Sequence, residues 1–192
     1  MEASPPRDAR RGYPDLHEHL EELKKRGLLL TIERPIDKDA ELHPLVRWQY
    51  VGGVEEHERK AFLFTNVVDG RGRQYRFPVV VGAFAGNREI YCIGMRTPAE
   101  EVQHKWDHAI ANPLPPRIVE SAPCQEVVIV GEALKGEGNG LDSLPIPIST
   151  PGYDSAPTLT ATNVITKDPD TGVQNHGTYR AGLKAPDRCV IR

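Results

Sequence analysis

The sequence predicts an α+β chain in which an N-terminal α/β domain precedes a C-terminal part made of strands. Helical spacing of apolar residues, together with capping residues, is found before residue 112. After that point β-branched runs bounded by turn residues dominate. Glycine and proline occur 17 times each in 192 residues. This share favours many turns and short strands over a bundle of helices.

The first expected element is a helix that starts after Asp15. Leu16, Leu20 and Leu23 follow at positions i, i+4 and i+7, and Gly27 ends the helix. The next elements are a strand over residues 28–33 and a helix over 39–50, whose Pro44 lies in its first turn or kinks it. Paired strands over 61–67 and 77–83, joined by a turn at 69–72, follow.

The last helix of the N-terminal part is expected to run from residue 97 to about residue 111. Thr97 would cap it, with Pro98 at its first position and Glu100 completing a capping box. The stretch before it contains Gly82, Gly86 and Gly94, which we expect to break up regular structure.

The C-terminal part follows a linker at residues 112–116, where two adjacent prolines fix an extended chain. We expect a strand over 125–130, a glycine-rich loop over 131–140 and an extended segment over 144–147. A hairpin of strands 158–167 and 173–183 around the turn 168–172 follows, and then a strand over 189–192. A strand at the last residue would leave an unpaired edge. We therefore expect the N-terminal portion of a longer protein, with residues 1–12 as a disordered tail, 13–115 as the N-terminal domain and 116–192 as a truncated second domain.

Composition excludes several classes of protein. The net charge of −3, the absence of a basic stripe and 6% aromatic residues do not favour nucleic acid as a partner. No stretch reaches the roughly 18 apolar residues of a membrane span, and the charged N-terminus differs from a signal peptide. Three widely separated cysteines indicate neither a disulfide framework nor a zinc site. A cytoplasmic location is expected.

The second strand of the expected hairpin carries the most informative residues. Arg180 could bind a carboxylate or phosphate through both guanidinium nitrogens, and the amide oxygen of Asn175 suits a hard cation. Gly177 would let a ligand approach the backbone. The bland alternative is a polar strand that faces solvent. The residues alone leave both interpretations open.

Several segments in the same order resemble one family. They are the helix PDLHEHLEELKKRG with the RPID that follows its strand, FLFTNV, GAFAGNRE, LPIP at 144–147, and the hairpin 160–180 with its TKDPDTG turn and its N-x-G-x-Y-R end. Together they resemble the UbiD family, whose members are decarboxylases that use prenylated FMN. The resemblance extends from Tyr13 to Arg192.

The resemblance implies a fold and a cofactor site. It implies that residues 116–192 form the first part of a split β-barrel like that of flavin reductases. By motif, Asn175 matches a ligand of a divalent metal, usually manganese, that bridges to the cofactor phosphate. Thr178, Tyr179 and Arg180 match the segment that contacts the flavin, and Arg192 matches a further basic contact. Arg180 would also be catalytic, beside the substrate carboxylate. Potassium is a further candidate cofactor.

The resemblance also limits what this chain could do alone. The family's other metal ligands, a His and a Glu, and its proton-transferring Glu residues lie beyond the matched hairpin. We therefore expect an inactive chain that needs the rest of its barrel, as a homo-oligomer or in a complex with another chain. The substrate would be an aromatic or α,β-unsaturated carboxylic acid. The alternatives are a non-catalytic fragment or subunit that completes a flavin site, and a flavin-binding redox module.

The spacing of the hairpin residues sets a condition on this interpretation. Five strand residues from Asn175 to Arg180 span roughly 16 Å, comparable to the length of FMN. An offset of five places the two side chains on opposite faces of a regular strand. Either a bulge, most easily at Gly177, or backbone contacts would be needed.

Other candidate sites carry weaker signals. His104 and His108 stand at i and i+4 on an expected helix, without a third ligand, so a solvated helix face is favoured. His176 would face away from Asn175 and is expected to be a surface residue. The loop 82–88 could hold a phosphate, but we expect a structural turn, because no well-capped helix is predicted after it.

Overall fold

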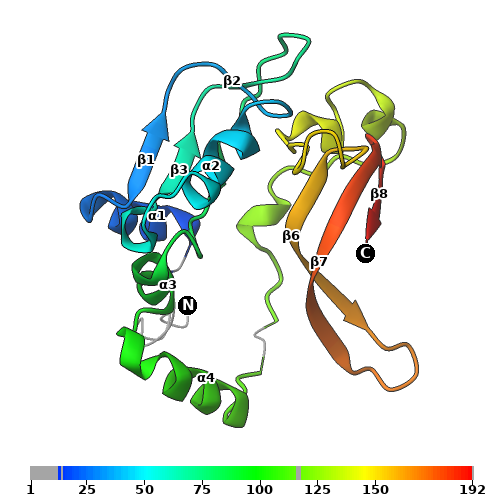
Figure 1. Ribbon diagram of the computed structural model, residues 1–192. Coiled ribbons are helices and arrows are strands. Elements are labelled where there is room, and N and C mark those ends of the chain that lie inside the picture. The colour runs from blue at the N-terminus through cyan, green and yellow to red at the C-terminus, as the bar shows by residue number, and fades with distance from the viewer. Residues whose placement is uncertain (1–12, 14, 116–117, 192) are drawn as a thin grey trace. The chain divides into compact units, whose positions relative to one another are not determined.

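The computed structural model describes residues 13, 15–115 and 118–191. Figure 1 shows its helices and strands. The chain divides into two compact units, the first formed by Met1–Ile32, Trp48–Leu63 and Val80–Glu120, and the second by Glu33–Arg47, Phe64–Val79 and Ser121–Arg192. The domain limits expected from the sequence remain a prediction, and the expected tail at residues 1–12 lies outside the described residues.

The first unit combines helices with a small sheet. Its helices are α1 (Leu16–Lys25), α3 (Arg88–Met95) and α4 (Val102–Ala111), with short 3-10 turns η1 (Glu56–Glu58) and η2 (Ala99–Glu101). The sheet has the order β1-β3-β5, formed by β1 (Leu29–Ile32), β3 (Ala61–Phe64) and β5 (Val79–Val81). Helix α2 (Leu42–Val51), with Pro44 in its first turn as predicted, begins in the second unit and ends in the first.

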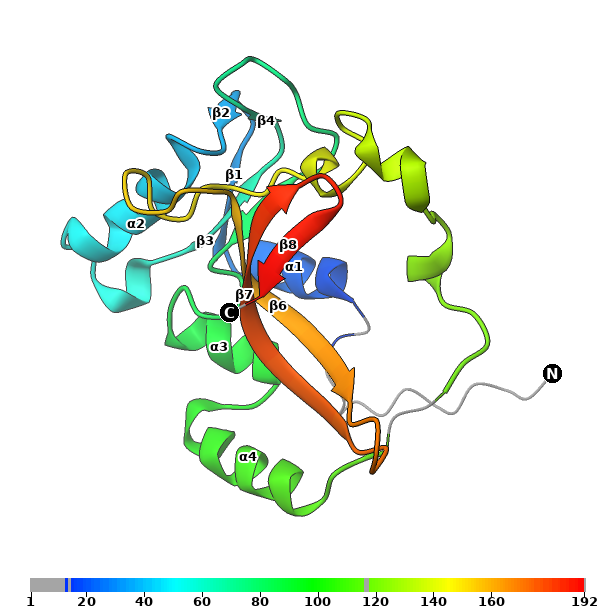
Figure 2. The same ribbon diagram turned by 90° about the vertical axis from the view of Figure 1, so that its right-hand side faces the viewer.

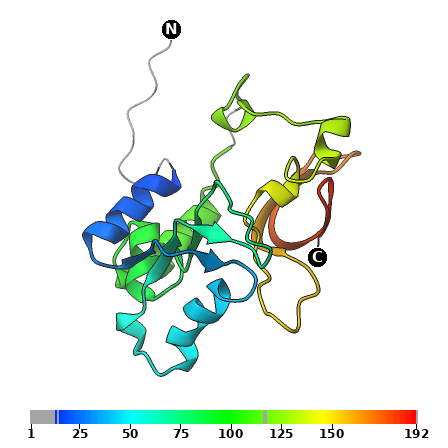
Figure 3. The ribbon, with the colours of Figure 1, turned by 90° about the horizontal axis from the view of Figure 1, so that it is seen from above.

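Helix α1 begins and ends as the sequence predicts. The Asp15 carboxylate accepts a hydrogen bond from the Glu18 backbone N–H at 3.0 Å, and Gly27 takes a φ of +70° just after the helix. Leu23 of α1 is wholly buried. It belongs to a core cluster that joins α1 and α3 to the sheet, with Leu28, Ala61, Ala83, Ile90 and Ile93. Figure 3 shows the ribbon of these helices and strands from above.

Helix α3 is missing from the sequence prediction, which expected glycines to break this stretch. Asn87 caps the helix, because its side-chain oxygen accepts from the Ile90 N–H at 2.7 Å. Ile90 and Ile93 are then buried in the core. The cap and this burial outweigh the helix cost of Gly94. The predicted Thr97 cap is also wrong, since the helix that ends at Ala111 starts with η2, where Pro98 makes no side-chain cap.

The second unit contains a short parallel pair of strands. Strand β2 (Ile36–Asp37) pairs with β4 (Val67–Val68), with Ile36 opposite Val67. The run predicted as one strand over 61–67 is therefore divided between β3 and β4. The predicted turn at 69–72 is present, because the Asp69 N–H donates to the Arg73 carbonyl at 3.1 Å.

The main sheet of the second unit is antiparallel. It consists of β6 (Thr158–Lys167), β7 (Gln174–Ala185) and β8 (Arg188–Ile191), in that order. Figure 2 shows β6 and β7 as a long twisted hairpin. The turn forms as predicted, because the Asp168 carboxylate accepts from the backbone N–H groups of Asp170 and Thr171 at 2.9 and 2.6 Å. Hydrogen bonds to Thr171 and Asp170 lower the pKa of Asp168.

The strand predicted over residues 125–130 is wrong. The structure has the 3-10 turn η3 (Pro123–Gln125) there, followed by irregular backbone up to η4 (Gly131–Lys135), and a third turn η5 (Leu141–Ser143) comes later. Val127, Val128 and Val130 are each about two-thirds or more exposed, at 75%, 69% and 68%. A strand needs a partner for its backbone groups, and none is paired with this run in the described part of the chain.

Gly172 closes the hairpin with a φ of +72°. A β-branched side chain is strained at this φ, so Gly172→Val is expected to lower the free energy of unfolding by about 1 kcal/mol or more. Gly172→Asn is the control, because asparagine tolerates left-handed backbone better than valine. Chemical denaturation measures both variants. An unchanged midpoint for the valine variant would contradict this role.

Candidate functional site

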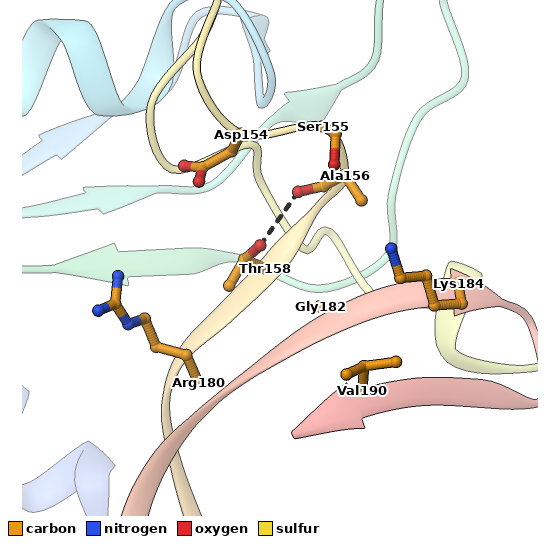
Figure 4. Close-up of a pocket in the computed structure, with 8 residues that line it drawn as sticks. All are labelled: Asp154, Ser155, Ala156, Thr158, Arg180, Gly182, Lys184 and Val190. Atoms are coloured by element: carbon orange, nitrogen blue, oxygen red, sulfur yellow. Dashed lines mark hydrogen bonds between the residues drawn. The ribbon is translucent and has the colours of Figure 1, made fainter. Parts of the chain in front are cut away.

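One cavity of the second unit lies against the hairpin. Its volume is about 250 Å³, and it is lined by Asp154, Ser155, Ala156, Thr158, Arg180, Gly182, Lys184 and Val190. Figure 4 shows Arg180 and Lys184 on β7 on either side of Gly182, with the loop residues and Thr158 across from them. Four of these residues therefore come from the loop and the start of β6, three from β7 and one from β8.

A buried ion pair holds the segment that leads into this cavity. Lys38 is 5% exposed, and its Nζ donates to the Asp39 carboxylate at 2.7 Å and to the Ile146 carbonyl at 2.9 Å. The Asp39 carboxylate accepts in turn from the Ile148 N–H at 3.0 Å. The Thr158 N–H then donates to the Pro147 carbonyl at 3.0 Å. These bonds fix the extended segment 144–147, which was predicted, at the start of β6.

Asp154 lies at the end of a tight turn. Its carboxylate accepts from the Thr150 N–H at 2.8 Å, and the Thr150 carbonyl accepts from the Asp154 N–H at 3.0 Å. Asp154 also acts on His43, whose pKa is lowered by burial while the nearby carboxylate opposes this shift. His43 is therefore biased towards the neutral form.

Two irregularities of the sheet coincide with the two cations of the cavity. On β6, Thr160 and Ala161 together lie opposite Arg180, because the pairing shifts between Leu159 and Thr162. On β7, Lys184 is an extra residue, because Leu183 pairs with Cys189 and Ala185 pairs with Arg188. Such bulges redirect side chains and are common next to active sites.

The charges of the cavity are unbalanced towards the positive. The side chains of Arg180 and Lys184 have no hydrogen-bond or ion-pair partner among the described residues. The Asp154 carboxylate, in contrast, is engaged by a backbone N–H. Two cations on one strand beside a cavity raise the local potential and favour an anionic ligand.

Gly182 leaves the floor of the cavity open. It pairs with Thr158 on one side and with Val190 on the other, so it lies in the middle of the sheet. A Cβ placed on Gly182 would meet no heavy atom within 4 Å. A flat ligand can therefore approach the backbone here, between Arg180 and Lys184.

Gly182→Leu is expected to fill this floor and to weaken ligand binding tenfold or more, while the fold is kept. The side chain would enter open space, and its backbone does not have a positive φ. Equilibrium binding of FMN and of benzoate measures the loss, and circular dichroism checks the fold. Gly53→Ala provides a strained control away from the cavity, at a φ of +81°. Unchanged binding in the leucine variant would show that ligands do not use this floor.

The structure places the predicted site residues on two faces of the hairpin. Asn175 is exposed and pairs with Thr166. Tyr179 pairs with Thr162 and shares the face of Asn175 by strand alternation. Thr178 is on the other face, with Arg180, and its Oγ1 is 3.4 Å from Asn163 Oδ1. Arg180 alone of these residues lines the cavity, and Arg192 lies outside the described residues.

Strand β7 has no bulge at Gly177. Such a bulge was one of the two ways in which Asn175 and Arg180 could reach one ligand. Gly177 pairs with Val164 in regular register. A Cβ at this position would collide with the ring of Tyr179, 2.4 Å from Cε2, and this accounts for a glycine in a regular strand. The glycine makes room for a side chain of its own strand. Backbone contacts remain the other way.

The described residues do not form a complete metal site. No group of three or more His, Cys, Asp or Glu side chains in the described ranges is placed to hold a metal ion. Asn175 offers one amide oxygen, which is one ligand of the six or so that a hard cation requires. The donor set is thus compatible with a metal only if other residues add to it.

The remaining candidate sites are the two histidines of α4, His176 and the loop 82–88. His104 and His108 are exposed on α4, without a third ligand in the described part of the chain. His176 is exposed, as predicted. The expectation that no well-capped helix follows the loop 82–88 is wrong, because α3 follows it with Asn87 as its cap. However, the Glu56 carboxylate already accepts from the Arg88 N–H at the start of this helix, so this N–H is not available to a phosphate.

Sequence reasoning missed Gly182, Lys184 and Asp154. The first two follow Arg180 at i+2 and i+4, so the alternation of a strand could have placed them on its face. Asp154 lies in a loop, where no period applies.

None of the helices in the described ranges is long and apolar enough to span a membrane.

The mixed α/β fold of the chain is found in a family of carboxy-lyases. A model of the 3-octaprenyl-4-hydroxybenzoate carboxy-lyase N-terminal domain matches residues 20–110, and a model of the Rift-related domain of the same carboxy-lyase matches residues 117–192. Together the two models cover most of the chain. The chain belongs to the UbiD family.

Solved structures agree with this membership. The UbiD-class enzyme HmfF from Pelotomaculum thermopropionicum in complex with FMN is 32% identical, with a TM-score of 0.71 over 92% of this chain and 36% of HmfF. An evolved dimeric form in complex with prFMN gives 32% and 0.69, over 92% and 37%. The closed form of the vanillic acid decarboxylase ShVdcCD from Sedimentibacter hydroxybenzoicus gives 25% and 0.75, over 95% and 37%.

The length of these relatives matters for function. A curated protein of Aquifex aeolicus (strain VF5) is 26% identical over an alignment of 201 positions, which covers 93% of this chain but 38% of that protein. The chain therefore spans little more than a third of the relatives that it matches.

Proposed function

We propose that this chain forms part of a carboxy-lyase that removes CO2 from an aromatic or α,β-unsaturated carboxylic acid with prenylated FMN. The observation that carries the proposal is the placement of Arg180 beside the open backbone of Gly182 in the cavity, in a chain of the UbiD family. A guanidinium binds a carboxylate through two parallel hydrogen bonds. An open glycine admits a flat ring.

The chemistry explains the need for a cofactor. Loss of CO2 from such an acid leaves negative charge on an sp2 carbon, and no amino-acid side chain delocalises it. Prenylated FMN supplies the electron sink when it is bound. The residues of this chain would bind and orient the acid. Arg180 would hold its carboxylate, and Gly182 would set how closely its ring approaches β7.

The proposed cofactor contacts extend along β7. Asn175 would be one ligand of a divalent metal, manganese, at the cofactor phosphate, with potassium as a further candidate ion. Thr178, Tyr179 and Arg192 would contact the flavin. Asn175 and Arg180 face opposite sides, so the backbone of residues 177–178 would complete these contacts.

In this proposal, the further ligands and the acid–base groups come from residues outside this chain. The proposal therefore includes the rest of a split β-barrel, supplied by a longer polypeptide or by another chain, and a homo-oligomer located in the cytoplasm. HmfF in an evolved dimeric form and the ShVdcCD decarboxylase are relatives with several chains or assembly forms.

The test uses the complete gene product that contains this chain. Bound flavin is measured by absorbance and mass after purification, and CO2 release is measured with a panel of cinnamic and benzoic acids. Flavin together with CO2 release is the expected result. Flavin that NADH reduces without CO2 release would indicate a redox module. A product that binds no flavin would contradict the proposal.

A further inference from the structure

We propose that Lys184 is a second anion-binding residue of the cavity and that it selects acids with two negative groups. A dicarboxylic acid would then bind more tightly than the matching monocarboxylic acid. This inference rests on the proposed function, because it places the acid beside Arg180. It adds the class of acid that the cavity prefers.

The position of Lys184 is the first argument. Lys184 is the extra residue of a bulge, and the cavity lining includes its side chain. The other bulge lies opposite Arg180. Both departures from regular pairing thus occur at the two cations and leave Gly182, between them, regularly paired on both sides. A bulge interrupts regular strand pairing. The presence of one bulge at each of the two cations indicates that the bulges direct these side chains into the cavity.

The charge is the second argument. The Lys184 side chain forms no ion pair among the residues that the structure describes. Asp187 is near in sequence, but its carboxylate pairs with Arg188 Nε at 3.3 Å. Asp154, across the cavity, accepts from Thr150. The ammonium group is left for a ligand.

The dimensions are the third argument. Arg180 and Lys184 are four strand residues apart, about 13 Å along the backbone. Their long side chains flank an open floor at Gly182. This arrangement suits one ring with an anionic group at each end. The 250 Å³ that these residues enclose is below the roughly 300–1,000 Å³ of drug-sized pockets, which favours a single-ring acid.

The second negative group could have another source, since the phosphate of FMN is also anionic. Riboflavin lacks this phosphate and otherwise matches FMN. Comparison of the two flavins therefore separates a lysine that binds cofactor phosphate from a lysine that binds the acid.

The experiment measures equilibrium binding by titration calorimetry to the complete gene product that contains this chain, freed of cofactor. The probes are benzoate, terephthalate, riboflavin and FMN. We expect terephthalate to bind about four- to tenfold more tightly than benzoate, because its two equivalent carboxylates give a statistical factor of two and one solvent-accessible ion pair gives about two- to fivefold. Lys184→Met should reduce this preference to the statistical factor and keep benzoate binding. Lys167→Met, at the far end of the hairpin, is the matched control and should keep both.

Every other outcome overturns the inference. A preference of no more than about twofold, or a larger one that survives in Lys184→Met, overturns it and leaves the proposed function intact. A preference for FMN over riboflavin that Lys184→Met abolishes assigns the lysine to the phosphate and also overturns it. If neither acid binds, the inference is likewise overturned, whereas the proposed function is decided separately by CO2 release.

Discussion

Arg180→Lys is expected to lower decarboxylation by two orders of magnitude or more, with flavin still bound. Lysine keeps the positive charge, but it loses the planar fork that holds a carboxylate through two hydrogen bonds. Removal of one positioned donor from an active site typically costs a factor of about 10² to 10³. The measurement is CO2 release at saturating acid, together with flavin content, in the complete gene product.

Arg188→Lys is the matched control for this result. Arg188 is on β8, outside the cavity lining, and it pairs with its neighbour Asp187. Its variant should keep normal turnover. Normal turnover in Arg180→Lys would show that the guanidinium does not position the acid, and loss of flavin would assign Arg180 to cofactor binding alone.

Asn175→Leu is expected to lose the divalent metal and the flavin together. The amide oxygen suits a hard cation and adds no negative charge beside a phosphate, whereas leucine offers no ligand atom. The side chain is exposed at the outer part of β7, so the substitution leaves the core untouched. Metal analysis and flavin absorbance of the purified complete gene product check both losses.

Gln174→Leu tests whether such a loss is specific. Gln174 is the neighbouring exposed residue and pairs with Lys167 at the start of β7. It should keep full metal and flavin. An Asn175→Leu protein that also kept both would remove this end of the strand from the cofactor site.

The parts of the fold that could be predicted are those whose cause is local. The turn of the hairpin depends on Asp168, whose carboxylate binds two nearby N–H groups, and on Gly172, which takes the left-handed backbone. Helix α1 depends on the Asp15 cap in the same way. These signals lie within five residues of the structure that they produce.

The errors have causes that lie outside the local sequence. Residues 125–130 have the composition of a strand, but pairing depends on an edge that sequence propensity does not supply. Helix α3 was missed because its glycines were given more weight than the Asn87 cap and the burial of Ile90. In the site, Arg180 could be identified by motif. Strand alternation could have placed Lys184 on the face of Arg180, but its bulge depends on the pairing of β7 with β8, which only the structure gives.

The exposed aliphatic run at residues 127–130 has a consequence for solubility. Four consecutive β-branched residues without proline have the composition that joins separate molecules into intermolecular sheets. Glu126 and Glu132 flank the run, and the Glu132 carboxylate pairs with Lys135 Nζ at 2.6 Å. Like charges on adjacent molecules repel one another, so we expect Glu126 to act as the gatekeeper of this run. High salt screens this repulsion and acid removes it. We therefore expect the colloidal stability of the chain to depend on the Glu126 carboxylate.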